Sequence, residues 1–191
     1  TEFSKETFER HEVSSCKECL SLIESSENFI WININGAPTK EWLNFLANQF
    51  ELHPLITEDI RTEQRPKIEP YENMLYIVLR SLNYSDSKGS ISNEQVSLLL
   101  GKKYLISFQE SARGISTQVI KRLQKSKSAI QRLGCDYLMY IFIDVIVDRY
   151  FTILGKIADV IDIEEDELVN NPQSSSFSRM GLLKREMINH L

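Results

Sequence analysis

Acidic side chains recur along residues 136–169, a segment whose pattern predicts one long helix. At 3.6 residues per turn, the aspartates fall on one arc of this helix and most of the large apolar residues on roughly the opposite arc. The acidic arc consists of Asp144, Asp148, Asp159, Asp162 and Asp166. Like charges three or four residues apart destabilise a helix by about 0.2–0.5 kcal/mol per pair. The stripe is therefore either a solvated face that aids solubility or a surface whose repulsion is relieved by divalent cations.

The type of ligand narrows the choice of cation. No histidine or cysteine belongs to the stripe, and carboxylate oxygens alone suit Mg²⁺ or Ca²⁺ rather than zinc. The spacing of an EF-hand loop is absent from the sequence. Carboxylates on one straight helix cannot surround an ion, so a second surface must approach them. We expect a hydrated Mg²⁺ held by a few carboxylates, because Mg²⁺ gives up its water reluctantly.

Composition and motifs exclude several functions. The net charge is −5, from 22 Lys and Arg against 27 Asp and Glu, whereas nucleic-acid-binding domains usually carry a basic surplus. The sequence has no GxSxG, P-loop or GxGxxG motif, so we expect no enzymatic activity. The longest apolar run, residues 137–143, is too short to span a membrane. Cys16 and Cys19 have CxxC spacing, which indicates a zinc half-site, a redox pair or, by default, two incidental helix cysteines.

The elements that must position these side chains are strands and short helices first and long helices afterwards. The pattern predicts an α/β fold, an α/β/α sandwich with a central mixed sheet followed by long helices. The predicted strands are 29–34, 74–82, 96–100 and 104–108, and the predicted helices are 39–50, 54–61, 118–128 and 136–169. Residues 178–191 also have a helical period without a stop signal, and the chain begins with Thr1 rather than Met. We therefore expect the natural protein to be longer than this chain.

Basic side chains give two further expectations. Arg65 and Lys67 flank Pro66, and we expect them to pair with nearby acids, for which Glu58, Glu63 and Glu69 are the candidates. His53 precedes Pro54 and is expected to pack or to cap a helix rather than to act as a base. The basic residues of 118–132 are expected to form a solvated face, or to lie opposite the acidic helix in an assembly.

Four segments together resemble the cytoplasmic domain of the CorA family of magnesium channels. They are HPLITEDIRTEQRPKIEPYEN at 53–73, EQVSLLL at 94–100, FQE at 108–110 and DYLMYIFIDVIVDRYF at 136–151. The similarity covers roughly residues 29–191. It implies a homopentamer whose cytosolic α/β domains lead through a stalk helix to two membrane helices. It also implies regulatory Mg²⁺ between neighbouring cytosolic domains that holds the channel closed, with Co²⁺ or other divalent cations as alternative ions.

The resemblance assigns roles to individual residues. The sensing carboxylate would be Asp59, with Glu58 beside it, and the paired aspartates of the long helix would be Asp144 and Asp148. Residues 1–169, including the acidic helix 136–169, would form the cytosolic domain, and residues 178–191 would begin the stalk helix. The domain would lie at the cytoplasmic face of the cell membrane, and the isolated chain would be soluble and assemble weakly or not at all.

Other functions remain open on the sequence. One is the cytosolic domain of a zinc transporter of the ZntB branch, which this chain resembles less. Another is a metal-dependent hydrolase that uses Asp59, Asp144 and Asp148, with its ion bound inside one subunit. A third is an acidic scaffold with no specific response to Mg²⁺.

Overall fold

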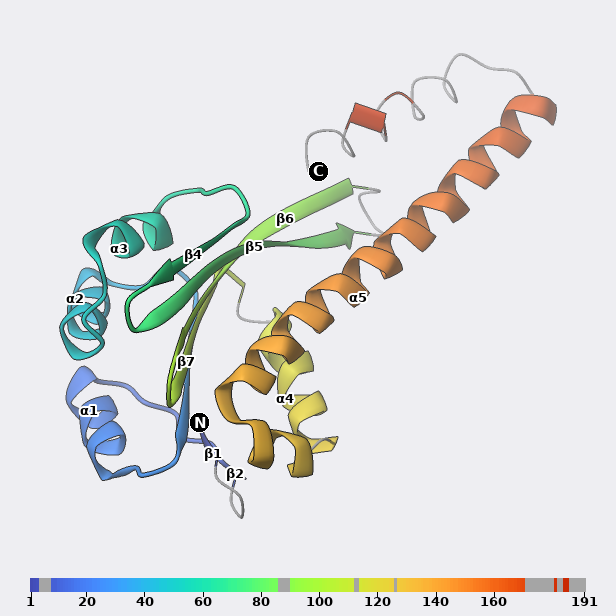
Figure 1. Ribbon diagram of the computed structural model, residues 1–191. Helices are drawn as coiled ribbons and strands as arrows, with labels where there is room; N and C mark the ends of the chain where they lie inside the picture. The colour runs from blue at the N-terminus through green and yellow to red at the C-terminus, as the bar shows by residue number, and fades with distance from the viewer. Residues whose placement is uncertain are drawn as a thin grey trace. The chain divides into compact units, whose positions relative to one another are not determined.

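The computed structural model describes residues 1–3, 8–85, 90–111, 114–125, 127–170, 181 and 184–185 (Figure 1). The described residues divide into two compact units. The first unit comprises Thr1–Arg80 and Gln95–Val145, and the second comprises Ser81–Glu94 and Ile146–Leu191. Most of the predicted stalk segment, 178–191, lies outside the described residues. Within this segment the structure describes only residues 181, 184 and 185, which are helical. The start of a stalk helix therefore stays a prediction.

The described strands form one mixed sheet. Its order is β2-β1-β3-β7-β6-β5-β4, with β3 and β7 parallel and with antiparallel pairs β1–β2, β1–β3, β4–β5 and β6–β7. The strands are β1 Glu2–Phe3, β2 Phe8–Glu9, β3 Phe29–Asn35, β4 Lys67–Tyr71, β5 Met74–Ser85, β6 Ser90–Gly101 and β7 Tyr104–Gln109. The central mixed sheet predicted from the sequence is confirmed, although β5 and β6 are longer than expected.

Helices cover both faces of the sheet within the first unit. Helices α1, α2 and α3 lie on one side, and α4 and the first turns of α5 lie on the other (Figure 1). Their bounds are α1 Cys16–Ser25, α2 Lys40–Gln49, α3 Pro54–Arg61, α4 Ile115–Lys125 and α5 Lys127–Asn170. The α/β/α sandwich followed by a long helix is therefore confirmed.

Alternating side chains on the strands build the two cores of this unit. Leu99 and Ile106 pack with Leu46 of α2 and Ile56 of α3 on one face. On the other face the ring of Trp31 meets Phe142 of α5 edge-on, with 5.5 Å between ring centroids. Each such buried side chain contributes about 1.5–3 kcal/mol relative to an exposed one, so burial on both faces fixes the register of the sheet.

Helix α5 contains one break. Gly134 has φ 67° and ψ −145°, and the chain on either side of it is helical. A Cβ atom at this position would lie 2.7 Å from Cζ of Phe29, so a side chain is excluded by space as well as by conformation. The predicted helix 136–169 is confirmed as the part of α5 that follows this break.

The second unit is built on α5. Ile153 and Ile157 of the helix pack against Leu82 and Ile91 of the strand segments. Val147 and Leu154 fall on the apolar arc of the helix, opposite the aspartates, but they are 42% and 48% exposed. The buried stripe of α5 is therefore narrower than the apolar arc of its sequence.

Candidate functional site

Helix α3 positions the first predicted carboxylates. Pro54 occupies its first turn, where the missing N–H has no helical partner to lose. His53 is the N-cap, and its Nδ1 accepts a hydrogen bond from the N–H of Leu55 at 3.2 Å. The expectation that His53 caps a helix is confirmed. Asp59 then falls in the last turn of α3, with its side chain only 13% exposed.

Lys67 of β4 neutralises Asp59. Its Nζ lies 2.6 Å from Oδ2 of Asp59 and 3.0 Å from Oε1 of Glu69, so one ammonium group bridges two carboxylates. The hydrogen bond to Asp59, more than any other contact, raises the pKa of Lys67 above its ordinary value, while burial acts in the opposite direction. The predicted pairing of Lys67 with Glu69 is confirmed, and the sequence analysis missed its pairing with Asp59.

Gln95 fixes the backbone beneath Asp59. Its Nε2 donates to the carbonyl oxygen of Asp59 at 3.0 Å, and its Oε1 accepts from the N–H of Gln64 at 2.8 Å. The Gln95 side chain is buried in β6, and Arg80 also donates to the carbonyl oxygen of Gln64, at 2.6 Å. The end of α3 is thus tied to the sheet through one amide side chain. The sequence analysis assigned Gln95 no role, although it stands in the EQVSLLL segment.

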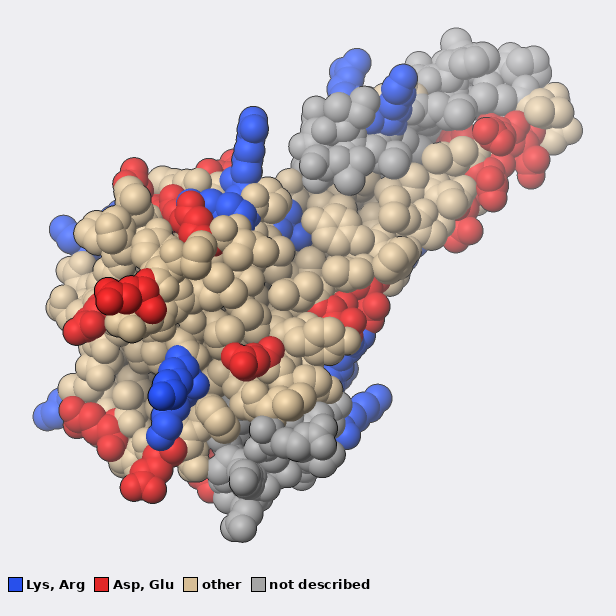
Figure 2. Space-filling model, in the orientation of Figure 1, with Lys and Arg blue, Asp and Glu red and all other residues tan. Residues whose placement is uncertain are grey.

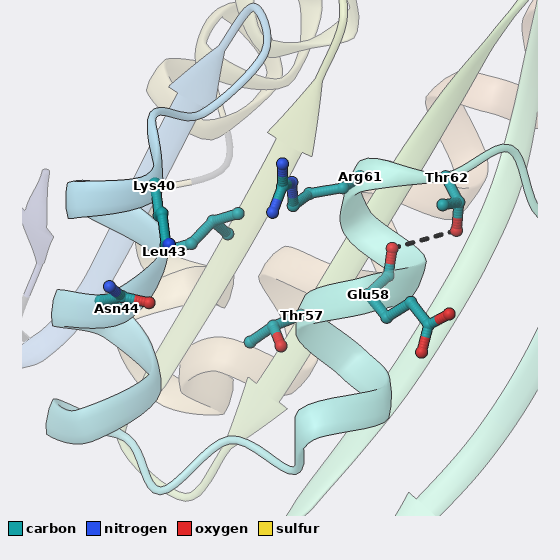
Figure 3. Close-up of a pocket in the computed structure, with 7 residues that line it drawn as sticks. All are labelled: Lys40, Leu43, Asn44, Thr57, Glu58, Arg61 and Thr62. Carbon is teal, nitrogen blue, oxygen red and sulfur yellow. Dashed lines mark hydrogen bonds between the residues drawn. The ribbon is translucent and has the colours of Figure 1, made fainter.

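Glu58 does not join this cluster. It lines a surface cavity of about 390 Å³ whose walls come from α2, α3 and Thr62. Arg61 points toward the space between the two helices, whereas the carboxylate of Glu58 points away from Arg61 (Figure 3). Residues adjacent in a helix are separated by about 100° around its axis, which explains why Glu58 and Asp59 face different surroundings.

The second pair of predicted carboxylates lies on α5. Oδ2 of Asp144 forms a salt bridge with Nη1 of Arg122 from α4, and both side chains are about one-third exposed. Asp148 follows one turn later in the sequence and is exposed, and its carbonyl oxygen accepts a hydrogen bond from the Thr152 hydroxyl at 2.9 Å. The basic helix therefore contacts the acidic helix within one chain, through Arg122.

The remaining aspartates of the stripe lie toward the end of α5. Asp159, Asp162 and Asp166 are exposed, whereas Glu164 is buried. Acidic side chains gather along this end of the helix (Figure 2). This part of the stripe is a solvated face in the chain as described.

Asp59 and Asp144 are not brought together in one chain. Asp59 belongs to the side of the sheet covered by α3, and Asp144 lies on α5, which covers the opposite side. Within the described ranges, no three side chains among His, Cys, Asp and Glu converge as a metal site. The carboxylates fit Mg²⁺ in ligand type but not in number within one chain, and a Mg²⁺ site at these residues stays a prediction. A hydrolase site that needs Asp59 and Asp144 side by side in one subunit is accordingly not formed.

The CxxC pair lies in α1, and both thiols are free. Burial is the foremost cause that raises the pKa of Cys16 and of Cys19 above the ordinary value. A redox nucleophile reacts as the thiolate and therefore needs a lowered pKa, which neither cysteine has.

Comparison with known proteins identifies the family. The family model described as CorA-like Mg²⁺ transporter protein matches residues 26–190. The cobalt/magnesium transport protein CorA of Thermotoga maritima is 35% identical over 187 residues, which are 97% of this chain and 53% of that protein. The soluble domain of CorA from Methanocaldococcus jannaschii superposes with a TM-score of 0.64 at 19% identity, covering 85% of this chain and 64% of that one. The ZntB cytoplasmic domain from Vibrio parahaemolyticus also gives a TM-score of 0.64, at 14% identity, covering 83% of this chain and 61% of that one.

The structural matches show the fold alone, because their identities are low and their TM-scores are equal. The sequence match distinguishes between the two transporter branches and favours CorA. The chain spans about half the length of the Thermotoga relative. No helix in the described part of the chain is long and apolar enough to cross a bilayer. The family consists of metal ion transporters rather than enzymes, and the chain belongs to this family of CorA-like Mg²⁺ transporter proteins.

Proposed function

We propose that the chain is the cytosolic Mg²⁺-sensing domain of a CorA-type homopentameric channel that admits magnesium, and also cobalt, across the membrane. The domain would sit at the cytoplasmic face of the cell membrane. The observation that carries the proposal is the 35% identity to a cobalt/magnesium transport protein over nearly the whole chain. A zinc-transporting function receives less support, because the ZntB likeness is one of fold at 14% identity.

The placement of the carboxylates supports sensing between subunits. A cyclic ring joins one face of each subunit to a different face of the next. Asp59 and Asp144 lie on opposite sides of the sheet, so two acidic faces are available for such contacts. Lys67 and Arg122 balance these two carboxylates within one chain, and a bound Mg²⁺ between subunits would supply the positive charge in their place.

The residues of the chain would have distinct tasks in this arrangement. Asp59 would present one carboxylate from a backbone held by Gln95, and Asp144 and Asp148 would present theirs from α5. Glu58 would be a peripheral acid, because its carboxylate faces a different surface from that of Asp59. An ion that binds the closed ring better than the open ring shifts the population by that difference in affinity.

The test is the response of this chain to MgCl₂ at constant ionic strength, followed by thermal unfolding and by oligomeric mass. At a free concentration ten times the dissociation constant, the ion should add about 1.4 kcal/mol to the free energy of unfolding. This corresponds to about 3–5 °C in the midpoint for a chain of this length.

Three variants make the test specific. Asp59→Asn and Asp144→Asn should abolish the response, because each removes one charged ligand. Asp136→Asn, an exposed acid on the same helix α5, should leave it intact. A response to MgCl₂ that Asp59→Asn and Asp144→Asn leave intact would reject these residues as a Mg²⁺ sensor.

A further inference from the structure

Two of the three carboxylates assigned to sensing, Asp59 and Asp144, are each paired with a basic side chain of their own chain. Lys67 contacts Asp59, and Arg122 contacts Asp144. A cation that arrives at Asp59 must therefore displace an ammonium group 2.6 Å away or share the carboxylate with it. Competition between Lys67 and an ion at Asp59 presupposes the proposed function.

Lys67 has a second partner, Glu69, which stays available to it when a cation binds to Asp59. Its Nζ lies 3.0 Å from Glu69, two residues along the same strand, and 5.7 Å from the centre of the Tyr76 ring. The hydroxyl of Tyr71 donates to the other oxygen of Glu69 at 3.2 Å and holds that carboxylate in place. The ammonium group can thus leave Asp59 without becoming an unpaired charge.

Asp59 itself stays in position during such an exchange. Gln95 holds its backbone carbonyl from β6, and this hydrogen bond does not involve the carboxylate. Only the long, flexible side chain of Lys67 has to move. The exchange is therefore local and does not require α3 to shift.

We propose that Lys67 is a tethered competitor for the divalent cation at Asp59 and that Glu69 is its alternative partner. In the ion-free state Lys67 bridges both carboxylates. In the ion-bound state it is held by Glu69 alone, and Asp59 faces the ion. The balance between Asp59 and Glu69 sets the cation concentration at which the sensor responds.

The size of the effect follows from the strength of the ion pair. A partly exposed pair between a lysine and a carboxylate changes an equilibrium by about fivefold at most. Removing Lys67 should therefore increase the affinity for Mg²⁺ about fivefold. Removing Glu69 should have the opposite sign, because Lys67 would then be held by Asp59 alone.

The experiment measures the dissociation constant of Mg²⁺ by calorimetric titration with MgCl₂ at constant ionic strength. The backbone amide signals of Asp59 and Gln95, observed by NMR, report where the ion binds. Lys67→Met keeps the apolar stem and removes the charge. Its matched control is Lys102→Met, an exposed lysine in the turn between β6 and β7, which changes the net charge equally. Lys67→Gln is the second variant if Lys67→Met does not fold.

Glu69→Gln tests the alternative partner, with Glu72→Gln in the turn between β4 and β5 as its control. Tighter binding in Lys67→Met than in Lys102→Met, together with weaker binding in Glu69→Gln than in Glu72→Gln, is the expected result. Equal affinities of Lys67→Met and Lys102→Met would overturn the competition.

Asp59→Asn separates this inference from the proposed function. If Asp59→Asn abolishes Mg²⁺ binding while Lys67→Met behaves as its control, sensing at Asp59 stands and the competition is wrong. If Asp59→Asn leaves Mg²⁺ binding unchanged, the proposed function at Asp59 is wrong and the inference is overturned with it. Binding that appears only in Lys67→Met, and disappears again when Asp59→Asn is added, would support both.

Discussion

Replacing Gln95 by Met tests how the chain holds Asp59 in place. Gln95 is 6% exposed, and its amide satisfies the carbonyl oxygen of Asp59 and the N–H of Gln64. Met has a similar length and fills the same space without hydrogen-bonding groups. Gln95→Met therefore removes both of these hydrogen bonds, and a longer one of 3.4 Å to the hydroxyl of Ser97, with little change in packing.

The expected cost is about 2 kcal/mol. A buried backbone group left without a partner costs about 1–3 kcal/mol. The N–H of Gln64 loses its hydrogen bond to Gln95, whereas the carbonyl oxygen of Asp59 keeps the N–H of Thr62 at 3.4 Å. Asp59 and Gln64 are only partly buried, so water can replace some of the lost contacts. For a chain of this length, 2 kcal/mol corresponds to about 4–8 °C in the unfolding midpoint.

Urea unfolding followed by circular dichroism measures the change directly. Gln118→Met is the control, because Gln118 is exposed on α4 and surface substitutions usually stay within about 0.5 kcal/mol. A Gln95→Met protein as stable as this control would refute the argument, since it would mean that water satisfies both backbone groups.

Three further outcomes are expected. Gly134→Ala should lower the free energy of unfolding by about 2–3 kcal/mol in urea, because the backbone has positive φ and the new Cβ would press on Phe29. Burial raises the pKa of Tyr76 from 10.0 to about 12. The contribution of the buried neutral phenol to the free energy of unfolding should therefore be complete below pH 10 and lost as the pH rises to about 12. The free energy of unfolding of Tyr76→Phe, measured over the same alkaline range, should not show this loss. Cys135 is buried, which raises the pKa of its thiol to about 12; an aromatic disulfide reagent at pH 8 should therefore label it only after unfolding.

Local signals explain which elements could be predicted from the sequence. The predicted strand 29–34 corresponds to β3, because its β-branched and aromatic residues end at an Asn-Gly turn signal. The predicted helix 54–61 has the observed bounds of α3, because Pro54 marks its start. Long stretches of uniform period, such as α5, were also predictable because many residues repeat the same signal.

Strand β4 could not be predicted in the same way. Its sequence KIEPY contains Pro70, which normally argues against a strand. The sheet accommodates Pro70 because β4 lies at an edge of the sheet and pairs with β5 alone. Whether a strand lies at an edge is a property of the whole sheet, so no pattern within five residues could reveal it.

The same distinction between local pattern and tertiary context applies to the candidate site. The resemblance to the CorA family identified Asp59 and Asp144 as candidate sensing carboxylates, because it matches individual positions of the sequence. Their partners depend on how α3 meets β4 and how α4 meets α5, which no local pattern determines. Glu69 could be proposed for Lys67 because it lies only two residues away in the sequence, whereas Asp59 lies eight residues away in another element. A carboxylate already paired with its own lysine binds a cation less readily than a solvated one. The residue that tunes the proposed sensor is therefore determined by tertiary contacts, although its ligands can be recognised from the sequence.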